Sequence, residues 1–495
     1  MAIQTEFETH RFVGEVCRLR GQSIVEYRLP GSEISSILSV QATATSSDCG
    51  CVDGEVRYGG KVVICIVYED GDKHVCRAER GAEFFHKAEG SSVTPACFAK
   101  AALSAENITW RREGSGLYIS VIVNADLAVY GSKQMEYLAG GEGLFTQTQP
   151  QTVRKTVCIS GETDGEDEFD ADYVGDILIH TEKAVAHRVT AADGQIEIEG
   201  EIALHICVLK PDDGVCSYER LLPFRMQIPS DEAYGECSAS ARICVKTAHL
   251  TASVDEEKGK SKMLFTYALS ADCFLCVQEE VSVVCDAFSA ATETVLKYKK
   301  DGGRYLTNTV KCTERVSGLA ALSPNMEGEF ALQASLLPRV EISCRKTENG
   351  FEAEGAVLAD LLFCGGNGEH RTSALSLPFA FPLSVDGDEV EADGLVCGLH
   401  IRRQKSGETE AEATLKLVVR CYKNGEWSYI QEVTEGESYA EENAAFSVYI
   451  PKTGEDLWSL AKRLRCDPAD IEANNPRLQF PLCGNERIFV YRQIK

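Results

Sequence analysis

Basic residues are scarce in this 495-residue chain: 50 Lys and Arg stand against 76 Asp and Glu, and the formal net charge is −26. Nucleic acids recruit net basic surfaces through their phosphates, and anionic bilayers attract clusters of Lys and Arg. The charge balance therefore argues against nucleic-acid binding and against passive binding to a membrane surface. Hydrophobic residues make up 44% of the chain, which is close to the globular norm, so we expect buried cores.

Long apolar runs are also lacking. The longest run that we find, Val62 to Tyr68, is far shorter than the ~20 residues that a membrane span needs. The N-terminal sequence MAIQTEFETHRFVGEV has neither the basic start nor the apolar stretch of a signal peptide. We therefore expect a cytoplasmic protein without membrane insertion.

Cysteine, by contrast, is abundant, with 21 residues. In a secreted chain this number would indicate a disulfide framework, but an odd count cannot pair completely within one chain. Most cysteines stand singly in apolar, strand-like runs, as Cys65, Cys207 and Cys364 do, and there a thiol acts as a small hydrophobic side chain. Reduced cysteines are the preferred interpretation, and a disulfide scaffold is the alternative.

Three segments share one local pattern and predict an internal repeat. They begin with Asp-Gly or Asn-Gly at positions 53, 193 and 349, and each continues into an apolar run interrupted by Gly60, Gly200 or Gly355. These glycines are 140 and 155 residues apart. Because the period is that long, each repeat is expected to be a domain by itself rather than a unit of a solenoid.

The repeats have the sequence features of β-structure. Val56–Tyr68, Ile196–Leu209 and Leu117–Tyr130 are rich in Val, Ile and Tyr and alternate partly between apolar and polar residues. Turns rich in Gly and Asp separate such runs, which is the pattern of β-hairpins. A glycine in the middle of a strand predicts a β-bulge or a sharp bend. We expect a mainly β fold of β-sandwich or open-barrel repeats.

These patterns divide the chain into five parts. Residues 1–148, 149–304 and 305–430 are the three expected β repeats, 431–446 is an acidic linker, and 447–495 is a small C-terminal domain. Residues 431–446 hold five glutamates and no cation, which is typical of a solvated segment. A second acidic stretch, 161–176, holds eight carboxylates and no cation, and it is expected to form a solvated acidic loop that could serve as a docking surface.

Helical periodicity replaces β alternation in the last fifty residues. Leu457, Leu460, Ala461 and Leu464 form one apolar stripe. Thr453 and Asp456 have the spacing of a capping box.

A second helix is predicted to begin at Asp467-Pro468 and to stop at Asn474-Asn475-Pro476. An apolar strand at 488–491 closes the chain. The expected order is strand, helix, helix, strand.

Residues 447–495 resemble the LysM domain, a small βααβ module known for binding polymers of N-acetylglucosamine. The resemblance rests on Tyr449, Gly454, Leu457-Trp458-Ser459-Leu460-Ala461, Ile471, Asn474, Leu482-Cys483-Gly484 and Ile488-Phe489-Val490. In LysM domains the sugar lies between the first turn and the loop after the second helix. The resemblance therefore implies a groove for a ligand or partner, lined by Gly454, Glu455, Asp456, Leu457, Asn475, Pro476 and Leu478.

Three β repeats followed by one LysM-like module also resemble the SipL-like family of clostridial spore-coat morphogenetic proteins. This resemblance covers essentially the whole chain and rests on the domain order and on blocks such as IEIEGEIALHICVL. It implies a protein of the mother cell that acts at the forespore surface. There it would help the ATPase of the spore-coat basement layer to encase the forespore, partly through the LysM domain.

No catalytic motif stands out. We find no P-loop, HExxH, GxSxG or strand-linked GxGxxG. Cys273 and Cys276 form a CxxC pair, but on a strand they would point to opposite faces, and no second pair completes a zinc site. Cys49 and Cys51 lie in a segment rich in Ser, Gly and Asp that predicts a loop. An ordinary loop is the preferred interpretation, and an exposed pair open to oxidation is the alternative. We expect no enzyme, no cofactor and no metal site.

The preferred hypothesis is a non-catalytic spore-coat assembly scaffold, which links coat morphogenetic proteins to the forespore surface through protein–protein contacts. The alternative is a cell-wall protein that binds peptidoglycan or a chitin-like glycan through its LysM-like module. An enzyme in the repeats stays open as a third possibility, because a cleft of titratable residues is not visible in one sequence. The C-terminal 49 residues carry eight Lys and Arg and six Asp and Glu, so a slightly basic tip follows an acidic body.

Overall fold

The computed structural model describes residues 3–30, 34–114, 116–172, 174–212, 214–234, 237–255, 259–320, 330–403, 409–440 and 445–491. The fold is mainly β, as predicted: strands β1 to β18 form six three-stranded antiparallel sheets, and a small C-terminal module adds a two-stranded sheet and two short helices. Among the described residues, no helix has the length and apolar character required to cross a membrane.

The repeated architecture predicted from the sequence is present in the strand order. In each repeat the first, sixth and fifth strands form one sheet in that order, and the second, third and fourth form another. The first repeat comprises β1 (Gln4–Pro30), β2 (Ser36–Val52), β3 (Glu55–Glu69), β4 (Val75–Glu89), β5 (Phe98–Glu113) and β6 (Gly116–Glu142). The second comprises β7 (Phe145–Asp172), β8 (Asp176–Ala192), β9 (Gln195–Leu209), β10 (Val215–Pro229), β11 (Cys237–Asp255) and β12 (Lys260–Phe288). The third comprises β13 (Thr292–Ala320), β14 (Phe330–Thr347), β15 (Gly350–Gly365), β16 (His370–Leu383), β17 (Glu389–Arg403) and β18 (Thr409–Ser438).

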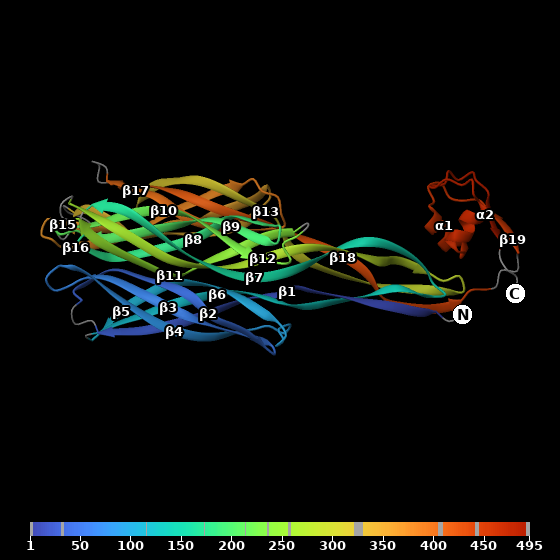
Figure 1. Ribbon diagram of the computed structural model, residues 1–495, viewed down its shortest axis with the longest axis horizontal. Helices are drawn as coiled ribbons and strands as arrows, with labels where there is room; N and C mark the ends of the chain where they lie inside the picture. The colour runs from blue at the N-terminus through green and yellow to red at the C-terminus, as the bar shows by residue number, and fades with distance from the viewer. Residues whose placement is uncertain are drawn as a thin grey trace.

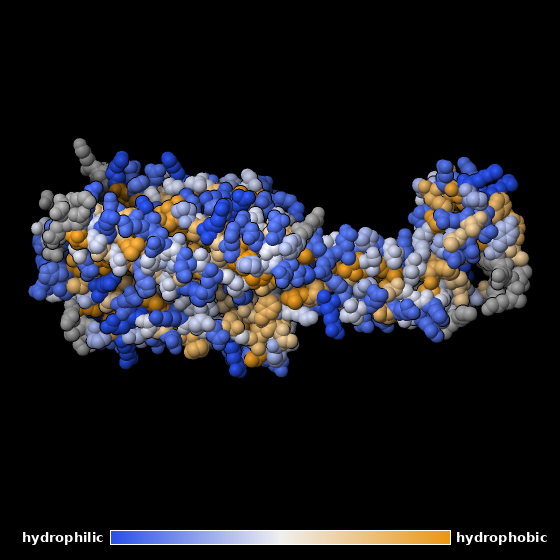
Figure 2. Space-filling model, in the orientation of Figure 1, coloured by the Kyte–Doolittle hydropathy of each residue, from blue (hydrophilic) through white to orange (hydrophobic). Residues whose placement is uncertain are grey.

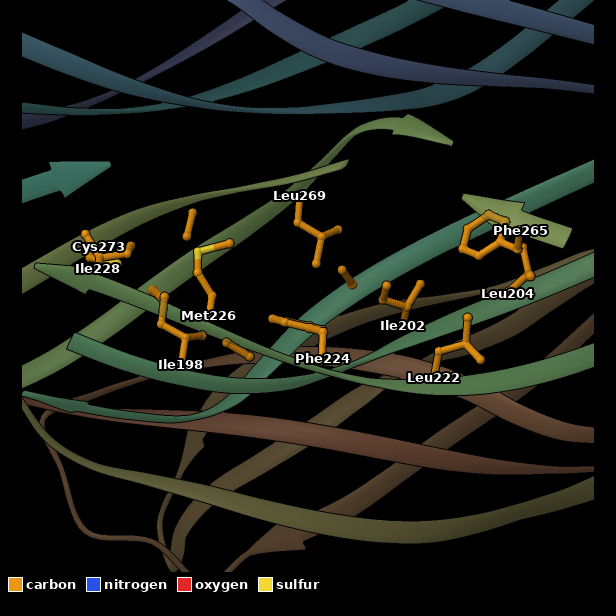
Figure 3. Close-up of a cluster of buried hydrophobic side chains, with 14 of the residues drawn as sticks. Ile198, Ile202, Leu204, Leu222, Phe224, Met226, Ile228, Phe265, Leu269 and Cys273 are labelled. Atoms are coloured by element: carbon orange, nitrogen blue, oxygen red, sulfur yellow. The ribbon is translucent and has the colours of Figure 1, made fainter. Parts of the chain in front are cut away.

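Each repeat is a sandwich with its own core between the two sheets. In the second repeat, Ile198 and Leu204 of β9, Phe224 of β10, and Phe265 and Leu269 of β12 are buried in one cluster, which Figure 3 shows between the sheets. The first and third repeats have equivalent cores. Alternation of apolar and polar side chains along each strand places one face in the core and the other outside.

The glycines that interrupt the repeats lie in the central strands β3, β9 and β15, each opposite a phenylalanine of the neighbouring strand; the pairs are Gly60 with Phe84, Gly200 with Phe224 and Gly355 with Phe379. The bulges that these glycines predict occur in the other neighbour of the central strand, on the side away from the phenylalanine. The register shifts in β2 beside Gly60 and in β8 beside Gly200, whereas at Gly355 it continues unbroken on both sides.

Three long strand pairs extend beyond the sandwiches as a stalk, which Figure 1 shows as the narrow part of the molecule. We define the stalk as residues 4–12, 135–142, 145–153, 281–288, 292–298 and 427–438, the outer ends of β1 with β6, β7 with β12, and β13 with β18. Each repeat contributes one pair. The pairs meet around buried side chains, among them Phe12, Met135, Val153, Val283 and Tyr429.

Two acidic segments form strands where the sequence predicts a loop and a linker. Residues 162–172 belong to β7 and pair with β12, so the acidic loop is wrong for this part. Exposed acids at 162, 164, 166, 168, 170 and 172 alternate with less exposed residues on the other face, where the one acid, Asp167, pairs with Arg220. Residues 431–438 continue β18 and pair with β13, so no linker begins at 431. Residues 441–444 of the predicted linker lie outside the described residues.

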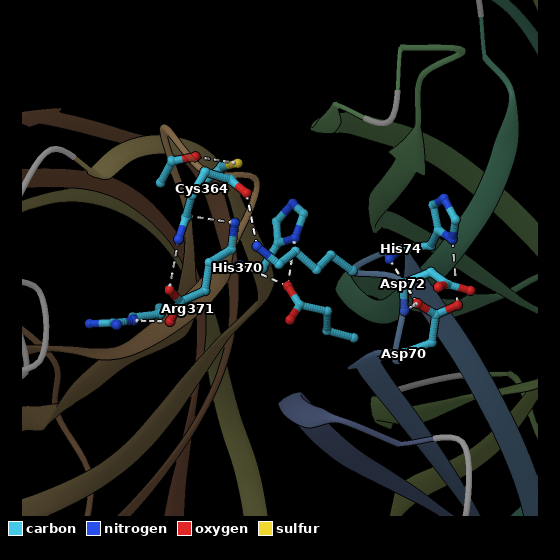
Figure 4. A network of polar contacts seen from close by, with 11 residues as sticks. Asp70, Asp72, His74, Cys364, His370 and Arg371 are labelled. Carbon is cyan, nitrogen blue, oxygen red and sulfur yellow. Dashed lines mark hydrogen bonds and ion pairs between the residues drawn. The ribbon is translucent and has the colours of Figure 1, made fainter.

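The β3–β4 and β15–β16 hairpins of the first and third repeats contact each other. The buried carboxylate of Glu69 accepts the backbone N–H of His370 at 2.8 Å and lies 3.0 Å from its Nδ1. Lys73 donates to the Asn367 carbonyl at 2.9 Å. Figure 4 shows His370 next to the Asp70–His74 turn. The Asp70 carboxylate accepts the backbone N–H groups of Asp72 and His74, so it closes this turn.

Glu391 joins the first and third repeats through two arginines. Its carboxylate accepts from Arg18 and from Arg304, each at 2.8 Å. Burial alone would raise the pKa of Glu391, but the two guanidinium groups hold it at about 2.

Acid is expected to weaken this junction. Because the folded-state pKa of Glu391 lies below the unfolded value, its stabilisation is complete above about pH 4.5 and is lost as the pH falls toward 2. Urea midpoints measured at pH 7, 5, 4 and 3 should therefore fall more steeply for the wild type than for Glu391→Gln, which has no carboxylate to protonate. If the urea midpoints of the two proteins fell equally with pH, Glu391 would not be the group that makes this junction sensitive to acid.

Candidate binding site at the C-terminal module

The C-terminal module has the predicted order of strand, helix, helix and strand: β19 (Phe446–Tyr449), α1 (Leu457–Leu464), α2 (Pro468–Asn474) and β20 (Ile488–Tyr491). Asp456 caps α1 by accepting the Ser459 N–H at 2.7 Å, so the cap lies three residues after the predicted Thr453. Asp467 caps α2 with Pro468 in its first turn, as predicted. Residues 492–495 of the predicted domain lie outside the described residues.

Two residues of the predicted groove have their polar groups occupied inside the module. Glu455 is buried and forms a two-pronged ion pair with Arg463, at 2.8 and 2.9 Å, which holds the pKa of Glu455 below its usual value. Asn475 is buried as well: its amide group donates to the carbonyls of Ile471 and Phe489 and accepts the Phe489 N–H, each at 2.8 Å. These side chains hold the module together and are not open to a ligand.

The other five predicted groove residues divide into two kinds. Gly454, Asp456 and Pro476 are exposed. Leu457 and Leu478 are half-buried and pack against the apolar core of the module. A glycan groove would therefore have to be formed by the exposed three, and their role in binding stays a prediction.

The module docks on the tip of the stalk through one face of α1. The Asp286 carboxylate, at the end of β12, accepts the indole N–H of Trp458 at 2.9 Å and the Lys462 ammonium at 2.7 Å through both oxygens. The Trp458 ring lies edge-on against Phe288, 5.1 Å between centroids. Trp458 packs in the small core, as its place beside the apolar stripe indicates, but it also anchors the module to the second repeat. Nothing in the sequence marks Asp286 as its partner.

The outer face of the two-stranded sheet is apolar and uncovered in this structure. We call it the apolar face; it consists of Phe446, Val448, Ile450, Phe489 and Tyr491, all of which are exposed. Phe446 stacks on Phe489 with 5.9 Å between centroids and lies 5.0 Å from the Tyr491 ring. Period-two alternation sends Ile488 and Val490 into the core and their neighbours outward. Figure 2 shows apolar surface on this module, at the end of the stalk.

Two exposed cations are close in sequence to the apolar face. Lys452 lies two residues after Ile450, and Arg487 directly precedes β20. Singly exposed apolar residues are common, but a contiguous group of five with three aromatic rings is typical of an interaction surface. The sequence of 446–450 and 488–491 contains the signal for this apolar face. Both segments are apolar at nearly every position, although period-two alternation buries only one face of the sheet.

The thiols do not form an oxidation site of the predicted kind. None of the 21 cysteines, all of which lie within the described residues, forms a disulfide. Cys49 and Cys51 lie in strand β2, opposite Tyr58 and Val56, so the predicted loop is wrong. Burial raises the pKa of Cys49 to about 11 and also raises that of Cys51, which keeps both thiols protonated and poorly reactive at neutral pH. Cys273 is buried and Cys276 is half-buried, on opposite faces of β12.

Comparison of the chain with protein-family models, with curated proteins and with solved structures finds no match in any of the three.

Proposed function

We propose that the chain is a non-catalytic scaffold of the spore coat, which links coat morphogenetic proteins to the forespore surface through protein–protein contacts. The observation that carries the proposal is the apolar face, held at the end of a stalk to which all three repeats contribute. Hydrophobic side chains with aromatic anchors and a charged border are typical of protein interfaces.

The partner that fits this face is a protein with an apolar patch bordered by acidic residues. The cations at positions 452 and 487 and the net charge of +2 in residues 447–495 favour such a border, while the first 446 residues carry −28. The stalk keeps the acidic sandwiches away from an acidic partner, since screening at physiological salt limits charge repulsion to about 8 Å. From the resemblance to the SipL-like family, we propose the ATPase of the coat basement layer as this partner, in the mother cell.

Peptidoglycan binding through the LysM-like groove is the second candidate. The exposed Gly454, Asp456 and Pro476 favour it, whereas the internal hydrogen bonds of Asn475 and the ion pair of Glu455 count against it. The two candidates use different surfaces of one small module, so separate substitutions distinguish them.

Replacing Ile450 by serine is expected to reduce capture of the coat ATPase by the full-length chain at least tenfold, because loss of one interface anchor costs about 2 kcal/mol. Ile450 is 72% exposed, so the fold should be unaffected. The measurement is affinity capture from extracts of sporulating cells, with the ATPase quantified by mass spectrometry.

Ile24→Ser is the matched control, since Ile24 is an equally apolar residue, 66% exposed, in the first repeat. It should leave capture unchanged. Equal capture by the wild type and Ile450→Ser would refute the role of the apolar face. Loss of capture in Asp456→Ala, with retention in Ile450→Ser, would shift the site to the groove.

A further inference from the structure

Four arginines converge on a cavity where the three repeats meet, away from the C-terminal module. The cavity is lined by β1 and β6 of the first repeat, by β7, β11 and β12 of the second, and by β13, β17 and β18 of the third. Its charged lining consists of Arg18, Arg242, Arg304, Arg420, Glu15 and Glu391. In a chain with a net charge of −26, such a concentration of guanidinium groups is unusual.

Three of the four arginines have carboxylate partners. Arg18 lies between Glu15, at 2.9 Å, and Glu391. Arg304 contacts Glu391, and it also pairs with Glu389 at 2.9 Å.

Arg420 contacts Asp393 at 3.4 Å. Glu389 and Asp393 neutralise their arginines from outside the cavity lining, so the charge of these three groups is balanced by the chain itself.

Arg242 is the exception. Its Nη1 is buried and has no hydrogen-bond partner among the described residues. Asp272 is its cross-strand neighbour on β12, but Oδ1 of that carboxylate accepts from Lys100 at 2.6 Å and from Ser160 at 2.7 Å. A buried charged donor without an acceptor is costly, and such groups call for a ligand, an ion or an ordered water.

The size and lining of the cavity fit a small oxyanion. The cavity offers about 80 Å³ to a small ligand, several times the ~10–15 Å³ that one water molecule needs by the same measure. The hydroxyls of Thr156, Ser238 and Ser240 line it together with the guanidinium groups. Hydroxyl and guanidinium donors around one small space are the groups that recognise phosphate and carboxylate oxygens.

We propose that this cavity binds a small oxyanion, phosphate or a short carboxylate, with Arg242 as its principal charged ligand. The bound anion would complete the hydrogen bonding of Arg242 and connect all three repeats at their junction. This site is independent of the apolar face and of the proposed scaffold function.

The test is calorimetric titration of the full-length protein, purified in Tris chloride, with sodium phosphate, sulfate and succinate at constant ionic strength. We expect saturable binding of at least one of these anions, with the preferred probe separating phosphate-type from carboxylate ligands. Arg242→Gln should weaken that binding at least tenfold. Arg20→Gln, at an arginine whose side chain is 93% exposed, should bind like the wild type.

A second measurement covers the case in which Arg242→Gln folds poorly. Without the anion, Arg242→Met should be at least as stable to urea as the wild type, because it removes a buried guanidinium N–H group that has no acceptor. Adding the anion should stabilise only the wild type. No saturable binding of any of the three anions, or a marked loss of stability in anion-free Arg242→Met, would overturn the proposal.

Discussion

Replacing Gly200 by alanine is expected to destabilise the second repeat by about 3 kcal/mol, at the upper end of overpacking effects. An added Cβ would lie 2.2 Å from Cζ of Phe224 and 2.6 Å from the Val185 carbonyl oxygen, on opposite sides of β9. The ring could rotate, but the backbone of β8 has no such freedom. Thermal unfolding of the purified chain should show a midpoint lowered by roughly 6–12 °C for the transition that includes this repeat.

Two further variants separate the causes. Gly50→Ala, at an exposed strand glycine with no atom within 4 Å of the added Cβ, should change stability by less than about 0.5 kcal/mol. The double variant Gly200→Ala/Phe224→Leu should recover only part of the loss, because the clash with the Val185 carbonyl remains. An unfolding midpoint of Gly200→Ala equal to that of the wild type would show that β8 and β9 do not approach each other closely at this position.

Replacing Asp286 by alanine is expected to detach the C-terminal module from the stalk. The substitution removes the acceptor of both Trp458 and Lys462, and hydrogen bonds to a charged group contribute about 1.5–3 kcal/mol each. A loss of about 3 kcal/mol corresponds to a roughly hundred-fold increase in the population of the open form. Hydrogen exchange of peptides covering residues 281–288 and 457–464 should accelerate by that factor.

The conservative variant Asp286→Asn keeps an oxygen acceptor for the Trp458 indole and loses the charge that attracts Lys462. Its exchange should therefore lie between those of the wild type and Asp286→Ala. Exchange inside the sandwiches, at Ile198 or Leu269 for example, should be unchanged because these residues belong to a separate core. Unchanged exchange at 281–288 in Asp286→Ala would show that the docking contact contributes nothing.

The local pattern of the sequence predicts those parts of the fold that depend on neighbouring residues. Gly60, Gly200 and Gly355 recur at corresponding places because a backbone carbonyl of the strand on one side and a phenylalanine ring from the strand on the other leave no room for a side chain there. Asp467 and Pro468 start α2 as predicted, since cap and first-turn preferences act within a few residues.

The stalk was beyond prediction because its stability comes from contacts between repeats. Residues 431–438 of the stalk and residues 162–172 of the second sandwich have the composition of solvated segments, yet pairing with β13 and with β12, respectively, holds them in β-structure. Tertiary pairing overrides the weak strand preference of acidic residues there.

In the candidate site, too, the sequence predicts what depends on neighbouring residues and not what depends on tertiary contacts. The βααβ order and the apolar stripe of α1 follow from periodicity. The burial of Glu455 and Asn475 does not, because it depends on Arg463 and on the backbone of β20, which the chain brings close only after folding. For Trp458, the amphipathic stripe indicates packing, but its partner Asp286 is 172 positions away in sequence.

Side-by-side binding of the purified full-length chain to the coat ATPase and to insoluble peptidoglycan tests the central claim most directly. The proposed scaffold function predicts saturable binding to the ATPase that Ile450→Ser weakens at least tenfold and Ile24→Ser leaves unchanged, with no retention on peptidoglycan. Retention on peptidoglycan that requires Asp456, together with no measurable binding to the ATPase, would contradict it.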